Sequence, residues 1–206
     1  PSKQDPFVPQ KLIQRFGLEP LVGQPGKRPR VYQGQLSLSV GEALALRLVV
    51  GGMGRLAAAA AAGLLQGLVL ADAKAEQAAE HGERRSIYWL NLGIAGHGWR
   101  PLGEAVLASA VHEQATGTRL GLTQPFEEPC PLVEVETHDV VVHAYPESDR
   151  AVDMEAAAFV AAAKGYAALW SAGPEASRAA AAQVQCLKVI SDNSASPLDW
   201  IMPTNS

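Results

Sequence analysis

The chain has 206 residues, of which 48% are hydrophobic and 18% are charged, and its formal net charge is −4. This length is sufficient for one domain with a sizeable core. The mild acidity argues against nucleic acid as a partner, because binding phosphates takes clustered Lys and Arg side chains. We therefore predict a single domain over residues 1–206, with an irregular N-terminal part at 1–30 and an irregular tail at 194–206.

Cysteine usage and hydropathy place the chain in the cytoplasm. Cys130 and Cys186 lie far apart and match no disulfide or zinc framework, and the five histidines show no metal-ligand spacing. We expect no metal. The apolar run Leu56–Leu70 is interrupted by two glycines and a glutamine, so we expect no membrane span. The N-terminus shows no signal peptide.

The first half of the chain predicts a hairpin followed by a helix. A short helix is expected over Lys11–Phe16, stopped at Gly17. Arg30–Leu38 and Ala43–Val50 read as two paired strands. An Ala-rich helix is then expected over Leu56–Ala71, because alanine has the highest helix propensity.

A glycine-rich turn, Gly51–Arg55, opens this helix. Free backbone N–H groups and the positive end of the helix dipole make Gly52, Gly54 and Arg55 a possible anion or water site. Tight packing of the turn against a sheet explains the glycines equally well. Arg55 is most simply a solvated residue of the first turn.

The middle of the chain predicts more strands. Ser86–Leu92 is almost continuously apolar, as expected of a strand covered on both faces, and it runs into a second glycine cluster, Gly93–Gly98. A flat ligand can approach the backbone at such a strand end. Further strands are expected at Ala105–Val111 and Leu132–Val142, on either side of a Pro-rich loop at Leu122–Pro131.

The last part predicts two helices and a final strand. After a loop at Tyr145–Arg150, helices are expected over Ala156–Leu169 and about Glu175–Gln183. Gln185–Asn193 then has the pattern of a buried strand whose last residues emerge at the sheet edge. Strands that alternate with helices indicate one α/β domain.

Asp192 lies where chemistry is expected, since ligands of open α/β sheets sit beyond the carboxyl ends of strands. A carboxylate beside apolar strand residues is a candidate general acid. The alternative is that Asp192 caps the next turn, which Ser-Asp-Asn clusters often do.

Four segments together resemble the purine nucleoside phosphorylase/nucleosidase superfamily, and are most similar to its methylthioadenosine/S-adenosylhomocysteine nucleosidase branch and to the adenosylhopane nucleosidases. These are the segments Gly51-Gly52-Met53-Gly54-Arg55, Asn91-Leu92-Gly93-Ile94-Ala95-Gly96-His97, Val152-Asp153-Met154-Glu155-Ala156-Ala157 and Val189-Ile190-Ser191-Asp192-Asn193. They occur in the same order and at similar spacing, and the resemblance covers about Val31 to Asn193.

The resemblance implies a three-layer α/β/α fold with a twisted mixed central sheet, and cleavage of the N-glycosidic bond of a purine nucleoside of the adenine type. By position, Asp192 would protonate the leaving base at N7, while Glu155 and Met154 would hold the ribose. The remaining candidate contacts are Met53 at the 5′ substituent, the base-lining residues Ile94, Ala95 and Gly96, and also His97 and Ser191.

Two carboxylates suit this reaction. Its oxocarbenium-like transition state needs a proton for the leaving group and negative charge near the sugar. Glu155 stands where a helix begins, and the dipole there favours its ionised form. Without the resemblance, Glu155 reads as an ordinary first-turn acid and Met154 as core filler.

The chain departs from the family pattern in three places. Asp5 is the only acid near the expected position of the residue that orients the attacking water. The closing C-terminal helix has no counterpart, although Trp200, Ile201 and Met202 offer partial cover. The base-stacking segment has no clear match around His138–Tyr145.

These departures leave alternatives open. Hydrolysis is preferred to phosphorolysis because Arg55 and Arg100 form no recognisable clamp for phosphate as a co-substrate. A module that binds a nucleoside without chemistry is the alternative from another class. We expect no cofactor, a small nucleoside as the ligand, and a homodimer built on the lightly charged helices.

Overall fold

The computed structural model describes residues 10–21, 30–37, 43–78, 87–122, 124, 129–172 and 183–197. Three expectations lie wholly or mostly outside these residues: the water-orienting Asp5, the cover from residues 200–202, and the helix at about 175–183, of which only Gln183 is described, as a strand residue. Of the expected irregular parts, only residues 10–21, the strand residue Arg30 and 194–197 are described.

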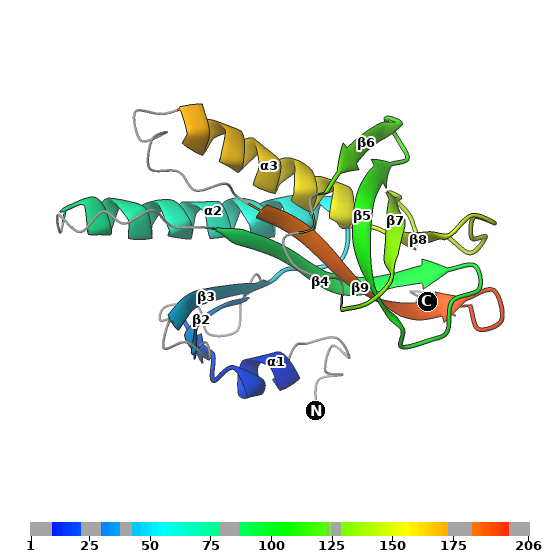
Figure 1. The fold of residues 1–206 in the computed structure, drawn as a ribbon, viewed down its shortest axis with the longest axis horizontal. Coiled ribbons are helices and arrows are strands. Elements are labelled where there is room, and N and C mark those ends of the chain that lie inside the picture. Colours follow the sequence, from blue (N-terminus) through cyan, green and yellow to red (C-terminus); the bar gives the residue numbers. More distant parts are fainter. Residues whose placement is uncertain are drawn as a thin grey trace, which may run out of the picture.

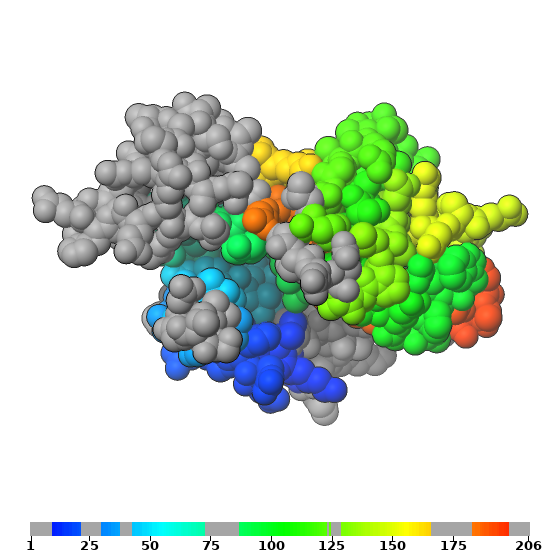
Figure 2. All heavy atoms as spheres, viewed as in Figure 1, coloured from blue at the N-terminus to red at the C-terminus, as the bar shows by residue number. Residues whose placement is uncertain are grey.

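The N-terminal elements form a small antiparallel sheet. Helix α1 (Gln10–Arg15) precedes the short strand β1 (Glu19–Pro20), and β2 (Arg30–Ser37) pairs along its whole length with β3 (Ala43–Val50). The predicted hairpin is thus confirmed. Figure 2 shows these blue and cyan elements gathered on one side, apart from the green and yellow strands.

The main sheet is mixed and closes on itself. It contains β4 (Tyr88–His97), β5 (Ala105–Glu113), β6 (Thr118–Gly121), β7 (Leu132–Thr137), β8 (Arg150–Asp153) and β9 (Gln183–Asn193). The order is β6-β5-β7-β8-β4-β9, and β5 pairs with β9 as well. The five strands β5, β7, β8, β4 and β9 therefore form a ring, in which β4 and β9 are parallel while β8 is antiparallel to β4.

Two long helices accompany this sheet. In Figure 1 both α2 (Arg55–Ala78) and α3 (Ala156–Ala172) lie above β4 and β9. The two helices pack against each other, and α3 also packs on the sheet strands. The mixed sheet with packed helices confirms the predicted α/β class, although the described helices that cover the sheet form one layer rather than two.

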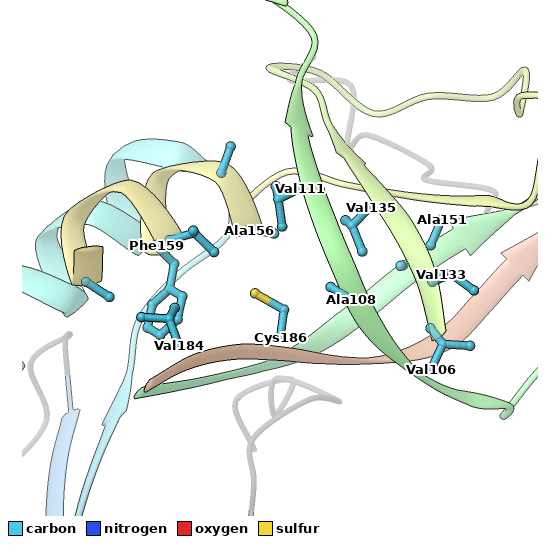
Figure 3. Packing of buried hydrophobic residues seen from close by; sticks show 14 of the residues in the cluster. Val106, Ala108, Val111, Val133, Val135, Ala151, Ala156, Phe159, Val184 and Cys186 are labelled. Atoms are coloured by element: carbon cyan, nitrogen blue, oxygen red, sulfur yellow. The ribbon is translucent and has the colours of Figure 1, made fainter. Parts of the chain in front are cut away.

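The core forms where α3 meets the strands. Buried residues of α3 recur at helical spacing, which places them on one face of the helix (Ala156, Ala157, Phe159, Val160, Ala163). Figure 3 shows Phe159 and Ala156 directed toward Val184 and Cys186 of β9 and toward the valines of β5 and β7. The small side chains let helix and sheet approach closely, as the sequence predicts.

Several predicted boundaries are wrong. The strand expected over Leu132–Val142 ends at Thr137, because its partner β8 ends at Asp153, the residue that pairs with Thr137. Strands β6 and β8 are absent from the sequence prediction, since each spans four residues. The second glycine cluster does not follow a strand: Gly93–His97 lie inside β4.

One face of β4 is open, contrary to the expectation that both faces are covered. Tyr88, Leu90 and Leu92 are 55%, 49% and 43% exposed, whereas Trp89 between them is 4% exposed. This alternation is the period-2 pattern of a strand with one buried face.

Helix α2 is the one described helix that is long and apolar enough to cross a membrane, by length and composition. Its segment Arg55–Asp72 has a mean hydropathy of 1.3, and 11% of it is buried. Ala58 and Ala62 of this segment are buried in the structure, and α2 packs against α3.

Candidate functional site

Asp192 lies at the end of β9, and a β-bulge sets its direction. Ala95 of β4 pairs with Ile190, but the next residue, Gly96, pairs with Asp192, so that Ser191 is an extra residue. Bulges often redirect side chains near functional sites. The side chain of Asp192 is buried, and the hydroxyls of Ser191 and Tyr145 donate to its two oxygens.

Tyr145 is the contact that sequence reasoning missed. It comes from the loop before β8, 47 residues away from Asp192 along the chain. Burial, with the hydrogen bond to Asp192 adding to it, raises the pKa of the Tyr145 hydroxyl above its usual value. The hydroxyl therefore stays protonated and can donate. No sequence pattern links a loop tyrosine to a strand-end aspartate.

Gly96 leaves room for this arrangement. A Cβ atom at this position would lie 2.5 Å from Oδ2 of Asp192 and 2.5 Å from Cε1 of Tyr145. A glycine inside a strand commonly marks such a close approach. Ile94, Ala95 and Gly96 thus lie on the strand beside the proposed acid, and the carbonyl of Ala95 lies 3.4 Å from the Ser191 hydroxyl.

Glu155 stands at the start of α3 and meets the glycine turn at the start of α2. Its Oε1 accepts a hydrogen bond of 2.6 Å from the N–H of Gly54. Gly54 has a φ of 92°, which favours glycine, and its carbonyl accepts the first helical bond of α2 from Ala58. The turn at Gly54 therefore binds the protein's own Glu155 carboxylate, while the assignment of Gly52, Gly54 and Arg55 to an anion or water site stays a prediction.

Arg55 is not the solvated residue that we expected. Its guanidinium forms an ion pair of 2.7 Å with Asp139 and a second ion pair with Glu113, and its side chain is 31% exposed. These carboxylates raise the pKa of Arg55, the hydrogen bond to Asp139 being the largest cause. The other candidate phosphate ligand, Arg100, is likewise held by Asp149 and Glu104.

An open hollow of about 660 Å³ lies beside the two helix starts. Met53, which is 55% exposed, and Met154 both border it, so the structure brings these two predicted substrate contacts together. The other residues that line the hollow are Gly54, Arg55, Leu56, Ala59, Asp139 and Ala158. Most of this lining is apolar.

The two acids come from neighbouring parts of the ring. Gly96 pairs with Asp192 on one side and with Val152 on the other, so that Asp192, Gly96 and Val152 form a row across β9, β4 and β8. Glu155 follows Val152 by three residues. The lining of the hollow includes neither Asp192 nor Glu155.

His97 is built into the protein rather than offered to a ligand. Its side chain is fully buried, Nδ1 accepts 3.2 Å hydrogen bonds from the N–H groups of Trp99 and Arg100, and Nε2 lies 3.1 Å from Asp149. Burial lowers the pKa of His97, although Asp149 opposes this shift. The ring of His97, which the resemblance offers as a substrate contact, is thus enclosed by the protein, and its hydrogen bonds fix the turn after β4.

A buried ion pair also escaped the sequence analysis. Nζ of Lys188 lies 2.7 Å from Oδ2 of Asp153, and both side chains are fully buried. The signal was a lysine within an apolar strand four residues before Asp192. Within the part of the chain that the structure describes, no group of three or more His, Cys, Asp or Glu side chains could hold a metal ion.

No protein-family model matches the chain, and no curated protein matches it. Solved structures do resemble it. The MTAN of Chlamydia trachomatis has a TM-score of 0.55 and 19% identity, over 89% of this chain and 75% of that chain. The MTA/SAH nucleosidase of Streptococcus pneumoniae, in complex with 8-aminoadenine, has a TM-score of 0.55 and 18% identity, over 91% and 83%.

A putative 5′-methylthioadenosine/S-adenosylhomocysteine nucleosidase of Borrelia burgdorferi, bound to adenine, has a TM-score of 0.55 and 13% identity, over 89% of this chain and 82% of that chain. These identities are low, but the similarity extends over most of each chain. The chain has the fold of the methylthioadenosine/S-adenosylhomocysteine nucleosidases.

Proposed function

We propose that this protein hydrolyses the N-glycosidic bond of a purine nucleoside of the adenine type. One observation carries the proposal: on this fold, the buried carboxylate of Asp192 lies beside a strand glycine and close in the sheet to the segment that leads to Glu155. Solved structures with this fold include complexes with adenine, 8-aminoadenine, MTA and 5-methylthiotubericidin.

In this proposal Asp192 is the general acid. It takes up a proton and donates it to N7 of the base as the glycosidic bond breaks, so that the base leaves as a neutral molecule. The hydroxyls of Ser191 and Tyr145 fix the orientation of its carboxyl group. Because Gly96 has no side chain, the Asp192 carboxyl group and the Tyr145 ring can lie close against the strand.

Glu155 supplies negative charge near the sugar in this proposal. Its Oε1 is held by the Gly54 N–H, which leaves Oε2 to accept from ribose hydroxyls and to stabilise the developing oxocarbenium charge. Met154 and Met53 border the adjoining hollow, whose apolar lining suits the 5′ substituent. Neither residue takes part in proton transfer.

Water is preferred to phosphate as the nucleophile. A phosphorylase needs Arg or Lys groups that converge on phosphate. Arg55 and Arg100 are each paired with two carboxylates, so that neither presents an uncompensated charge to an anion. This supports hydrolysis without a cofactor and weighs against phosphorolysis.

We further propose that the protein is a cytoplasmic homodimer built on α2. Small and apolar residues on this helix are exposed at a spacing of three to four residues, and Leu56 is 86% exposed. They form a stripe without charge (Leu56, Ala59, Ala60, Gly63, Gly67, Leu70). Small residues let two helices approach closely, which suits a two-fold interface.

The test of the function is release of free base. The protein is incubated with methylthioadenosine, S-adenosylhomocysteine, adenosine and inosine, each with and without phosphate, and base is measured by chromatography. We expect adenine without phosphate. Release that requires phosphate would overturn hydrolysis, and tight binding without release would support the alternative of an inactive nucleoside-binding module.

A further inference from the structure

The buried ion pair between Lys188 and Asp153 joins the two segments that carry the proposed acids. Lys188 lies on β9, four residues before Asp192, and Asp153 ends β8, two residues before Glu155. Nζ and Oδ2 are 2.7 Å apart, and neither side chain is exposed. Neither residue takes part in the proposed proton transfer. A pair of buried charges is costly to desolvate and therefore needs another explanation.

Asp153 fixes the start of α3. Its Oδ2 accepts a 2.8 Å hydrogen bond from the N–H of Ala156, as a helix-capping residue does. Its Oδ1 accepts a 2.6 Å bond from the hydroxyl of Thr137, whose oxygen in turn accepts from the N–H of Ala157 at 3.0 Å. Glu155 lies between Asp153 and these two amides, so this network sets its backbone position.

Lys188 fixes β9 from the other side. It pairs with Gly93 of β4, where a Cβ atom would lie 3.0 Å from Nζ, so only glycine leaves the ammonium its full space. Burial opposes the charge of Lys188, but the surrounding acidic groups, with Asp153 first among them, together outweigh it and raise the pKa of Lys188 above its usual value. Beyond Lys188 along β9, Ile190 and Asp192 are buried as well.

We propose that Lys188 and Asp153 are positioning residues, whose ion pair holds the strand that carries Asp192 and the helix start that carries Glu155 at a fixed separation. The consequence for turnover rests on the proposed function. Displacement of a reacting group by about 1 Å can cost roughly a hundredfold in rate, so a loosened pair should lower kcat without removing either acid.

The test compares Lys188→Met, Asp153→Asn and the double variant, with Lys164→Met on the exposed face of α3 as the control. Each single variant leaves a buried charge without its partner, and we expect lower thermal stability and a kcat at least about tenfold below the wild type. The double variant removes both charges. It should recover stability but not kcat, whereas Lys164→Met should keep both.

A purely structural role predicts instead that the double variant recovers both stability and kcat. If the folded double variant turned over at the wild-type rate, the positioning proposal would be overturned. Should the single variants fail to fold, Thr137→Val keeps both charges and removes only the hydroxyl that links Asp153 to Ala157. It should lower kcat several-fold, and an unchanged kcat would count against the proposal.

Amide hydrogen exchange separates this proposal from the proposed function. The amides of Ala156 and Ala157 should exchange at least about tenfold faster in Lys188→Met and in the double variant than in the control, because Lys188 no longer holds the residue at position 153 that caps the first turn of α3. If the wild type released no base, the proposed function would fail, while unchanged exchange at these two amides would overturn the positioning role by itself.

Discussion

The N–H of Gly54, at the start of α2, donates a 2.6 Å hydrogen bond to Oε1 of Glu155, at the start of α3. Two helix starts, 101 residues apart in sequence, thus share one carboxylate. The positive ends of both helices favour its negative charge. The glycine turn, which the sequence marks as a possible anion or water site, therefore binds Glu155, the residue that we propose faces the sugar.

Asp192→Asn should abolish turnover while nucleoside binding persists. Asparagine has nearly the same shape but cannot donate the proton, and general acids contribute roughly a hundred- to ten-thousandfold to rate. Adenine release gives the rate, and calorimetric titration with adenine gives the binding. Asp72→Asn, at an exposed pair with Arg47, is the matched control. An Asp192→Asn variant with the wild-type rate would remove the general-acid assignment.

Glu155→Gln should lower kcat/KM by roughly ten- to a hundredfold, because hydrogen bonds to a charged group are worth about 1.5–3 kcal/mol. The glutamine carbonyl can still accept from Gly54, so the melting temperature should stay near that of the wild type. Steady-state kinetics and thermal unfolding check this, with the exposed Glu147→Gln as the control. Equal kinetics in both variants would contradict a role at the sugar.

Gly96→Ala should damage both the site and the fold. The new methyl group would lie 2.5 Å from both the Asp192 carboxylate and the Tyr145 ring, and overpacking of this kind costs about 1–3 kcal/mol. Gly165→Ala on α3 meets open space and should instead stabilise by about 0.4–1 kcal/mol. Denaturant unfolding distinguishes the two. Equal stability of both variants would show that Gly96 is not a close-approach position.

Gly63→Arg should convert the dimer to a monomer. No atom of the described chain lies within 4 Å of a Cβ atom at this position, so the arginine meets only what a partner places there. Gly121→Arg, also in open space but at the end of β6, should leave the dimer intact. Light scattering after size-exclusion chromatography measures the mass. A monomeric wild type would refute the dimer at the outset.

His97 should make stability depend on pH. Because burial lowers its pKa in the folded state, the unfolded chain binds more protons as the pH falls below about 6.5, and the free energy of unfolding drops by at most about 1.4 kcal/mol per pH unit. Stability from this residue is thus present at neutral pH and lost on acidification. Urea unfolding between pH 7 and pH 5 should show a flatter slope for His97→Asn than for His143→Asn.

The sequence predicted the long elements well, because their patterns are local. The β2–β3 hairpin, the Ala-rich helices and the final strand follow from alternation, alanine content and an apolar run that ends in Ser-Asp-Asn. The four-residue strand β8 has no such pattern. Its four residues are strand only because β7 and β4 pair with them on either side.

Candidate site residues could be proposed from the sequence where the residue type and its motif indicate a role. They could not be proposed where the role depends on a partner that is distant in the sequence. Asp192 and Glu155 could be proposed from sequence. The partners of Arg55 and Tyr145 lie 47 or more residues away in the sequence, and the partner of Lys188 lies 35 residues away. No spacing rule therefore reveals these contacts. His97 was named as a candidate contact because nothing in the local sequence indicates the buried turn that encloses it.

The pairing of β9 with both β4 and β5 has a consequence for biosynthesis. The other four strands of the ring precede β9 in the sequence, so the ring cannot close until this segment has left the ribosome. The strand that completes the ring is also the one that bears Asp192. A nascent chain therefore closes the ring and gains its proposed proton donor in the same step.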